Sequence, residues 1–195
     1  MKLNKKQAEA YDLVLSGVNV CITGEAGTGK SVIVQQIKEN MEDSTIFLAP
    51  TGIAAINIGG VTIHSAFGAP MGLPTIAEMK TITKRSTLLF GSKKIKRIVI
   101  DEAYMTRPDL FEYMDSQLKM ARSSRAPFGG IQVIVVGDPL QLKAVLNSKG
   151  KEAKLFWERY ESLLPFTSPM WDKCEFNTVL LTQPMRQGNE GFLKA

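Results

Sequence analysis

Short apolar runs alternate along the chain with longer segments in which apolar residues recur every three or four positions. Almost wholly apolar or β-branched runs are typical of strands that are buried on both faces of a sheet. Five such runs lie at 18–23, 45–49, 97–100, 131–136 and 178–181. Between them, the segment from Pro108 to Arg122 is typical of an amphipathic helix that begins at a proline. Its apolar stripe consists of Leu110, Phe111, Met114, Leu118 and Ala121.

The first helix has a recognisable beginning and end. Asn4 is followed three positions later by Gln7, which predicts a capping box and a helix that begins near residue 5. Ser16 and Gly17 predict its end, and the apolar run that follows leads directly into a glycine-rich turn.

The alternation of strands and helices predicts an α/β fold, with a mainly parallel β-sheet covered by helices on both faces. A chain of 195 residues is long enough for one domain. Two segments, 69–97 and 146–171, fit no strand–helix–strand unit, and we interpret them as insertions.

Composition excludes several classes of protein. With 44% hydrophobic and 22% charged residues, the chain is not collagen-like, coiled-coil or largely disordered. No apolar run approaches the 18 residues needed to cross a bilayer, and the N-terminus resembles neither a signal nor a transit peptide. We therefore expect an intracellular protein without a membrane segment. Cys21, Cys174 and the single His64 are too few and too scattered for a zinc site.

Positive charge is concentrated in one segment of the chain. The net charge is +5, and between Met79 and Arg97 there are seven basic residues and no acidic one. Such a run is either a solvated basic face or a surface that follows phosphate groups, and the sequence leaves both interpretations open.

A phosphate-binding motif follows the first predicted strand. Its glycines let backbone N–H groups converge on phosphate oxygens, Lys30 supplies charge toward the β- and γ-phosphates, and the Ser31 hydroxyl is suited to bind Mg²⁺. The motif reads Gly24-Glu25-Ala26-Gly27-Thr28-Gly29-Lys30-Ser31. Its position between a buried strand and a helix is the one that this chemistry requires, so we predict ATP and Mg²⁺ as ligands.

Polar residues that suit nucleotide hydrolysis follow two further strands. Asp101 and Glu102 end the run at 97–100, where Asp101 would hold Mg²⁺ and Glu102 would orient and deprotonate water. Gln141 follows the run at 131–136 and could contact both the γ-phosphate and that water. Taken by itself, the segment 137–139 is an ordinary turn.

Together these motifs resemble the ordered helicase motifs of superfamily 1, and more narrowly those of the Pif-one and RecD-like group of DNA helicases. The resemblance covers Leu3 to Phe192. Its strings are Thr23 to Ser31, Ala49-Pro50-Thr51-Gly52-Ile53-Ala54-Ala55, Gly60-Val61-Thr62-Ile63-His64-Ser65, Asp101-Glu102, Gly137-Asp138-Pro139-Leu140-Gln141-Leu142 and Leu180 to Gln187. The chain departs from the group at Ala103-Tyr104, where the group usually has Ile-Ser, and at Lys143-Ala144, where it usually has two prolines.

The resemblance implies roles for further residues. Gln7 matches a glutamine that reads the adenine edge, although its capping-box role explains it equally well. Arg186 matches an arginine that reaches the γ-phosphate. The group's contacts with single-stranded DNA fall on Pro50, Thr51, His64 and Phe67; Phe67 or His64 could stack on a base while Thr51 binds phosphate.

The resemblance further implies the first RecA-like motor domain of a 5′-to-3′ DNA helicase, with the second motor domain absent from the chain and supplied in cis or in trans. We expect a monomer and a bacterial or viral source with a cytoplasmic location. From these residues alone we expect weak ATPase activity and no unwinding. The alternative is a non-motor module in which ATP regulates affinity for single-stranded nucleic acid. A small-molecule kinase is disfavoured because no arginine-rich lid is recognisable.

Overall fold

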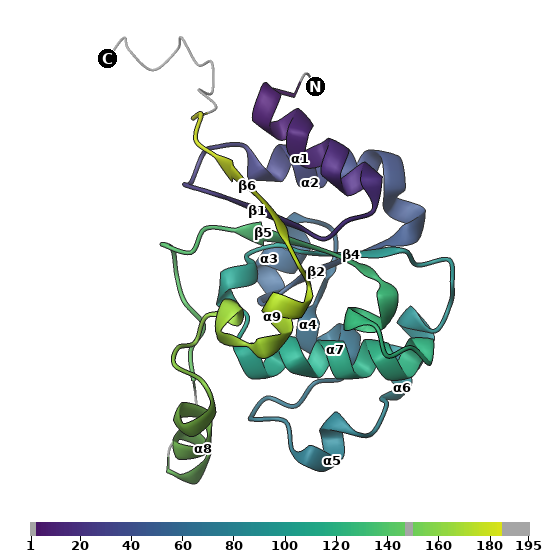
Figure 1. The fold of residues 1–195 in the computed structure, drawn as a ribbon, viewed down its shortest axis with the longest axis vertical. Helices are drawn as coiled ribbons and strands as arrows, with labels where there is room; N and C mark the ends of the chain where they lie inside the picture. The colour runs from purple at the N-terminus through teal and green to yellow at the C-terminus, as the bar shows by residue number, and fades with distance from the viewer. Residues whose placement is uncertain (1–2, 147–149, 185–195) are drawn as a thin grey trace.

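A six-stranded, wholly parallel β-sheet forms the centre of the computed structural model, which describes residues 3–146 and 150–184 (Figure 1). The strand order is β3-β2-β4-β5-β1-β6. The strands are β1 (Val20–Gly24), β2 (Thr45–Ala49), β3 (Val61–Thr62), β4 (Arg97–Ile100), β5 (Gln132–Gly137) and β6 (Asn177–Leu181).

Helices cover both faces of this sheet, as predicted. They are α1 (Lys5–Ser16), α2 (Lys30–Met41), α3 (Gly52–Asn57), α4 (Ile63–Phe67), α5 (Ile76–Met79), α6 (Lys84–Phe90), α7 (Pro108–Arg122), α8 (Lys151–Arg159) and α9 (Pro169–Lys173). Short 3₁₀ turns are η1 (Glu42–Ser44), η2 (Ala103–Met105), η3 (Pro127–Gly130) and η4 (Pro165–Thr167). None of the described helices is both long and apolar enough to cross a membrane.

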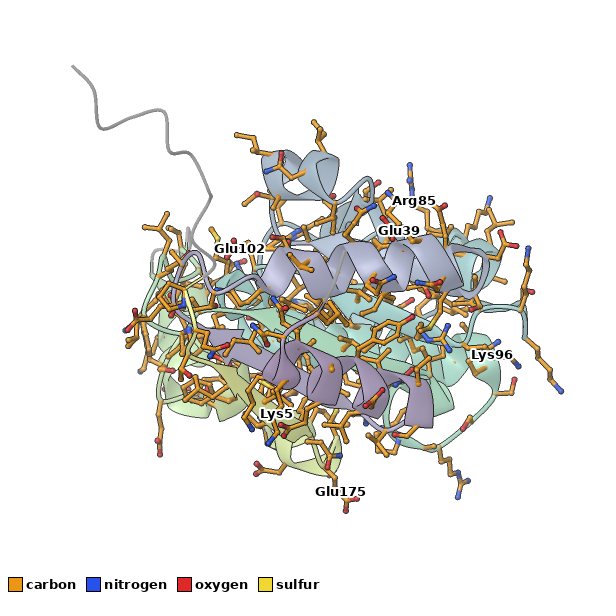
Figure 2. All side chains as sticks on the ribbon, turned by 90° about the horizontal axis from the view of Figure 1, so that it is seen from above. Lys5, Glu39, Arg85, Lys96, Glu102 and Glu175 are labelled. Atoms are coloured by element: carbon orange, nitrogen blue, oxygen red, sulfur yellow. The ribbon has the colours of Figure 1, made fainter. Side chains whose placement is uncertain are left out.

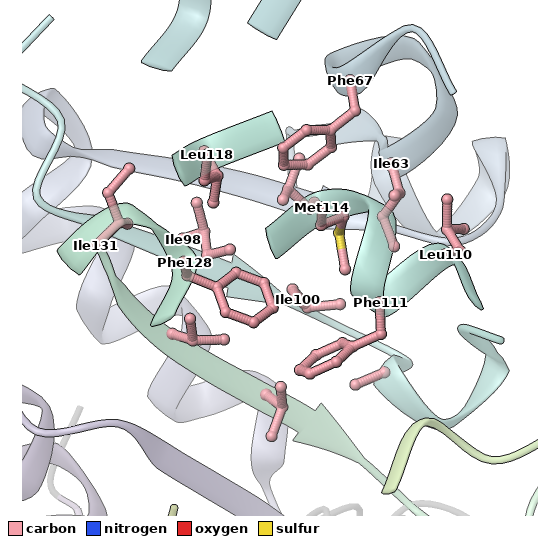
Figure 3. Packing of buried hydrophobic residues seen from close by; sticks show 14 of the residues in the cluster. Ile63, Phe67, Ile98, Ile100, Leu110, Phe111, Met114, Leu118, Phe128 and Ile131 are labelled. Carbon is pink, nitrogen blue, oxygen red and sulfur yellow. The ribbon is translucent and has the colours of Figure 1, made fainter. Parts of the chain in front are cut away.

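Two apolar cores lie between the sheet and the helices that cover its faces. One core joins α1 and α2 to the sheet through residues such as Val14 and Ile33. The other lies under α7, where Phe111 and Phe128 pack beside Ile98 and Ile100 of β4 (Figure 3). Because successive residues of each strand point to opposite faces, the buried strands are apolar at nearly every position.

Most predicted elements agree closely with the structure. The strands at 45–49 and 97–100 and the helix from Pro108 to Arg122 have the predicted bounds. The first strand begins only at Val20, because the Asn19 side chain accepts a hydrogen bond from Val133 N (2.7 Å) and donates one to Cys174 O (2.7 Å). The prediction missed β3, since two residues are too short to produce a periodic pattern.

The predicted capping box at α1 is confirmed. Asn4 Oδ1 accepts from Gln7 N (2.9 Å), and Gln7 Oε1 accepts from Asn4 N (2.9 Å). Gly17 ends the helix in the left-handed conformation. The segment 69–97 contains α5 and α6, and 146–171 contains α8 and η4. α6 contributes the fully buried Phe90 to the core under α7, whereas α8 extends away from the sheet-and-helix layers (Figure 1).

A buried ion pair at the start of α7 gives a stability prediction. Arg107 donates through Nε and Nη2 to the two carboxylate oxygens of Asp109 (2.9 and 2.8 Å), and through Nη2 to Gly72 O (2.9 Å). Asp109→Ala leaves a buried guanidinium without its carboxylate, so we expect a loss of about 3–5 kcal/mol in urea unfolding. Lys6→Ala, which breaks the exposed pair with Glu9, should cost less than about 1 kcal/mol. Equal losses in the two variants would contradict this account.

Candidate nucleotide-binding and catalytic site

The carboxyl ends of the parallel strands meet at one edge of the sheet and bring the predicted motifs together. The phosphate loop follows β1, Pro50 and Thr51 follow β2, Asp101 follows β4, and Asp138 follows β5. β5 lies between β1 and β4, so the segment carrying Gln141 begins between the phosphate loop and the two acids. Ligands of open parallel sheets bind at this edge.

The phosphate loop is closed around its lysine. Lys30 Nζ donates to Gly24 O (2.6 Å) and Glu25 O (2.9 Å), and Thr28 Oγ1 donates to Glu25 O (2.8 Å). A Cβ at Gly24 would lie 2.3 Å from Leu181 O, so a side chain would force β1 and β6 apart. The loop is therefore held by strand packing on one side and by its own lysine on the other.

The start of α2 is arranged to receive an anion. Gly29 caps this helix without a side-chain hydrogen bond, which leaves the first N–H groups directed toward a ligand. Ser31 is exposed in the first turn. The loop, the helix N-terminus and Lys30 together fit a triphosphate.

The two acids after β4 lie close to this lysine. Asp101 Oδ1 accepts from Glu102 N (3.0 Å). Burial raises the pKa of Asp101, while the bond from Glu102 N and the charge of Lys30 oppose the shift. Burial and the neighbouring Asp101 raise the pKa of Glu102, and Lys30 opposes that shift too. A cation beside these two carboxylates would therefore stabilise their ionised forms against the effect of burial.

Glu102 also has an unusual backbone. Its φ of 49° and ψ of 39° are left-handed, which costs a non-glycine residue about 1 kcal/mol or more. This conformation ends β4 and turns the chain immediately into η2. Strained residues of this kind cluster at functional sites, because the surrounding packing must hold them in place.

The sequence interpretation missed Asp138, which fixes the segment after β5. Its carboxylate accepts from Leu140 N (3.0 Å) and from Gln141 Nε2 (3.0 Å). Asp138 is buried, whereas Gln141 is exposed at the same edge. The available signal was an aspartate directly after a buried strand; the sequence places it in a turn and in a helicase motif but assigns it no role of its own.

Tyr104 is a second residue that the sequence interpretation did not assign. Its ring reaches across the end of β5, where a Cβ at Gly137 would lie 2.9 Å from Tyr104 Cδ2. Its hydroxyl lies 3.4 Å from Cys21 Sγ, and its ring contacts Phe166 and Trp171. Burial raises the pKa of Tyr104 far above its ordinary value. Where the helicase group usually has Ile-Ser, this chain therefore has Ala103 and an aromatic ring, Tyr104, that connects η2 to β1 and to η4.

Gln7 combines both of the properties discussed for it. In addition to the capping box, its Nε2 donates to Gly29 O (3.2 Å), so the start of α1 lies against the phosphate loop. The side chain is buried. Contact with the adenine edge remains a prediction.

The residues predicted to contact DNA lie at the start of α3 and on α4. Thr51 caps α3 by accepting from Ala54 N (3.2 Å), and Pro50 is half-buried beside it. His64 is half-buried, and burial followed by the charge of Arg107 lowers its pKa, which favours the neutral imidazole. Arg85, which the sequence interpretation did not select, donates to Ser65 O and Oγ (3.3 and 3.2 Å).

The prediction that Phe67 could stack on a base is wrong. Its side chain is fully buried, and its ring stacks on Phe90 with centroids 4.7 Å apart. The apolar core around α4 and α6 therefore uses the ring that the motif suggested for DNA. Arg186 lies outside the described residues.

A metal ion at this edge would be held by few protein groups. Among the described residues there is no group of three or more His, Cys, Asp or Glu side chains that could hold a metal. Ser31 and Asp101 suit Mg²⁺, which commonly binds one or two protein ligands together with phosphate oxygens and water. The donor set fits a metal that arrives with a nucleotide.

Comparisons with known proteins agree with this geometry. A family model described as PIF1-like helicase matches residues 2–194. The ATP-dependent DNA helicase PIF1 of Rattus norvegicus is 35% identical over 193 residues, which are 98% of this chain and 29% of that protein. The ATP-dependent DNA helicase Pif1 of Bdellovibrio bacteriovorus is 33% identical over 195 residues, which are 99% of this chain and 42% of that protein.

Solved structures give the same result. Bacteroides Pif1 in complex with ADP-AlF3 and single-stranded DNA is 35% identical, with a TM-score of 0.84 over 97% of this chain and 44% of that one. Pif1 helicase from Candida albicans is 31% identical, with a TM-score of 0.73 over 96% of this chain and 41% of that one. The fold is thus that of a RecA-like P-loop NTPase domain. The chain spans less than half the length of these relatives. The chain belongs to the PIF1-like helicase family.

Proposed function

We propose that the chain is the first motor domain of an ATP-dependent DNA helicase, which binds and hydrolyses ATP and couples this to single-stranded DNA. The observation that carries the proposal is the meeting of the phosphate loop, Asp101, Glu102 and Gln141 at one sheet edge. The names of the relatives and the DNA and ADP-AlF3 complex of the Bacteroides protein support it.

In the proposed mechanism, water attacks the γ-phosphate in line with the leaving group. Glu102 orients and deprotonates this water, while Lys30 and Arg186 stabilise charge on the transferred group. Ser31 and Asp101 would hold Mg²⁺, which supplies further neutralisation of the phosphate charge. Gln141, held by Asp138, links the site to DNA.

On the DNA side, we propose Pro50, Thr51 and His64 as contacts, with Arg85 added because it lies beside Ser65. A neutral His64 is suited to stacking or hydrogen bonding rather than to charge pairing. Unwinding with 5′-to-3′ polarity requires a second motor domain, in cis or in trans, because two domains must close and open on nucleotide. A DNA-directed ATPase of this kind works inside a cell, and we expect a monomer.

The proposal is tested by Mg-ATP turnover with and without an oligo-dT strand. We expect the strand to stimulate turnover, and His64→Ala to reduce the stimulation severalfold while leaving the basal rate unchanged. Ser162→Ala, in the loop between α8 and η4, serves as the control. Nucleotide-dependent DNA affinity without stimulated turnover would favour the alternative of an ATP-regulated binding module, and absence of both would refute the proposal.

A further inference from the structure

The basic run between Met79 and Arg97 divides into two groups in the structure. Lys80, Lys84 and Arg85 lie on or beside α5 and α6, and Arg85 donates to Ser65 O, next to the proposed DNA contact His64. Lys93, Lys94 and Lys96 are all exposed on the turn between α6 and β4, which we call the lysine turn (residues 92–96). Arg97 belongs to neither group, because it is half-buried and donates to Ser44 Oγ (2.7 Å).

The lysine turn lies far from the catalytic edge. It enters the amino end of β4, whereas Asp101 and Glu102 follow the carboxyl end of that strand. Figure 2 shows Lys96 and Glu102 at opposite ends of the molecule. The nucleotide site and the proposed single-strand contacts therefore do not account for this group of charges.

The backbone of the lysine turn is held by Arg122, by Ser44 and by a hydrogen bond within the turn. Arg122 donates through Nη1 to Ser92 O (2.5 Å) and through Nη2 to Ile95 O (2.5 Å). Lys96 N donates to Ser44 O (2.8 Å), and Lys94 N donates to Ser92 Oγ (3.1 Å). These bonds fix the positions from which the three lysine side chains extend, which reduces the ordering cost of binding.

A pocket of about 490 Å³ opens beside the turn, between it and the end of α7. Its lining contains no carboxylate and no aromatic side chain, and consists of Gly91, Lys93, Lys96, Ala121, Arg122, Ser123, Gly129 and Gly130. Within residues 3–146 and 150–184, no ion pair involves any of the three exposed lysines. Glu42 and Asp43 line a neighbouring pocket that also includes Ser44. The surface charge therefore becomes negative there, and this limits the extent of the basic surface on that side.

We propose that the lysine turn and this pocket form a second nucleic-acid surface that binds the phosphate backbone of duplex DNA. Lysine ammonium groups bind phosphate as point charges, without the planar geometry that arginine requires. Surfaces for single strands combine basic grooves with aromatic rings on which bases stack, and the pocket has no such ring. A duplex carries twice the backbone charge per unit length of a single strand, which suits a purely electrostatic surface.

The test measures binding of a blunt 20-base-pair duplex by fluorescence anisotropy over a range of salt concentrations, without nucleotide. The variant Lys93→Gln/Lys94→Gln/Lys96→Gln is compared with Lys5→Gln/Lys151→Gln/Lys154→Gln, which removes three exposed lysines from α1 and α8. We expect the first variant to weaken duplex binding about 10-fold or more at 0.1 M salt and to lower the slope of log K against log salt by about 2–3, and the control to change neither much.

Two further measurements separate this surface from the proposed motor function. The first variant should retain oligo-dT-stimulated ATP turnover, because its substitutions lie away from the catalytic edge. Equal effects of both variants on duplex binding, or no duplex binding by the wild-type chain at low salt, would overturn the inference. The inference would also be overturned if the first variant lost as much affinity for oligo-dT as for the duplex. It would likewise be overturned if the wild-type chain bound poly-glutamate in place of the duplex.

Discussion

Lys30→Ala is expected to reduce Mg-ATP turnover by about 100- to 1,000-fold or more while the domain stays folded. Two effects combine in this variant. The charge that Lys30 supplies toward the β- and γ-phosphates is lost, and so are the bonds from Nζ to Gly24 O and Glu25 O that close the phosphate loop. Turnover is measured by phosphate release, and folding by circular dichroism and thermal unfolding.

Lys38→Ala is the matched control for this prediction. Lys38 lies on the same helix, and its Nζ also donates to two backbone carbonyls, Ile58 O (2.9 Å) and Gly59 O (3.2 Å). The control variant should lose a comparable amount of stability and keep its turnover. Wild-type turnover in Lys30→Ala would refute the assignment of the phosphate loop, whereas equal loss in both variants would show that only folding was disturbed.

Glu102→Gln is expected to lower turnover by about 100- to 10,000-fold with little change in ATP affinity, since a glutamine can hold water but cannot accept its proton. Glu175→Gln is the control, because Glu175 also has a left-handed backbone (φ 48°) but is exposed and lies on another loop. ATP affinity is measured with a fluorescent nucleotide in single-turnover conditions. Loss of nucleotide binding would mean that Glu102 acts in structure rather than in catalysis.

The pH profile provides an independent measurement on the same residue. Burial and Asp101 raise the pKa of Glu102 above the 4.5 of an ordinary glutamate, and the base must be ionised to act. Turnover should therefore fall, as the pH is lowered, at a higher pH than an ordinary glutamate would give. Because its pKa is raised in the folded state, ionisation of the Glu102 carboxyl lowers the free energy of unfolding. This destabilisation is complete above the pKa of the folded state and absent below the pKa of the unfolded state. Glu102→Gln should thus raise Tm at pH 7 and lose this gain near pH 4.

The strand–helix alternation, and the position of the phosphate loop within it, follow from local features of the sequence. Buried parallel strands must be apolar at nearly every position, and a phosphate loop requires glycines and a lysine at fixed spacing, so both features are local properties of the chain. The capping box at Asn4 and Gln7 is local in the same way. Fold class, nucleotide chemistry and the acids after β4 could therefore be predicted without coordinates.

Tertiary packing, in contrast, controls which side chains remain available for a ligand. Phe67 lies within a DNA-binding motif, but packing against Phe90 buries its ring. Tyr104, unassigned from the sequence, reaches Cys21 across the space left by Gly137. The basic residues between Met79 and Arg97 form one segment of the sequence, yet α6 lies between Lys84 and Arg85 at its start and the lysine turn after its end. Such outcomes depend on contacts between residues far apart in the chain, and motif spacing carries no information about them.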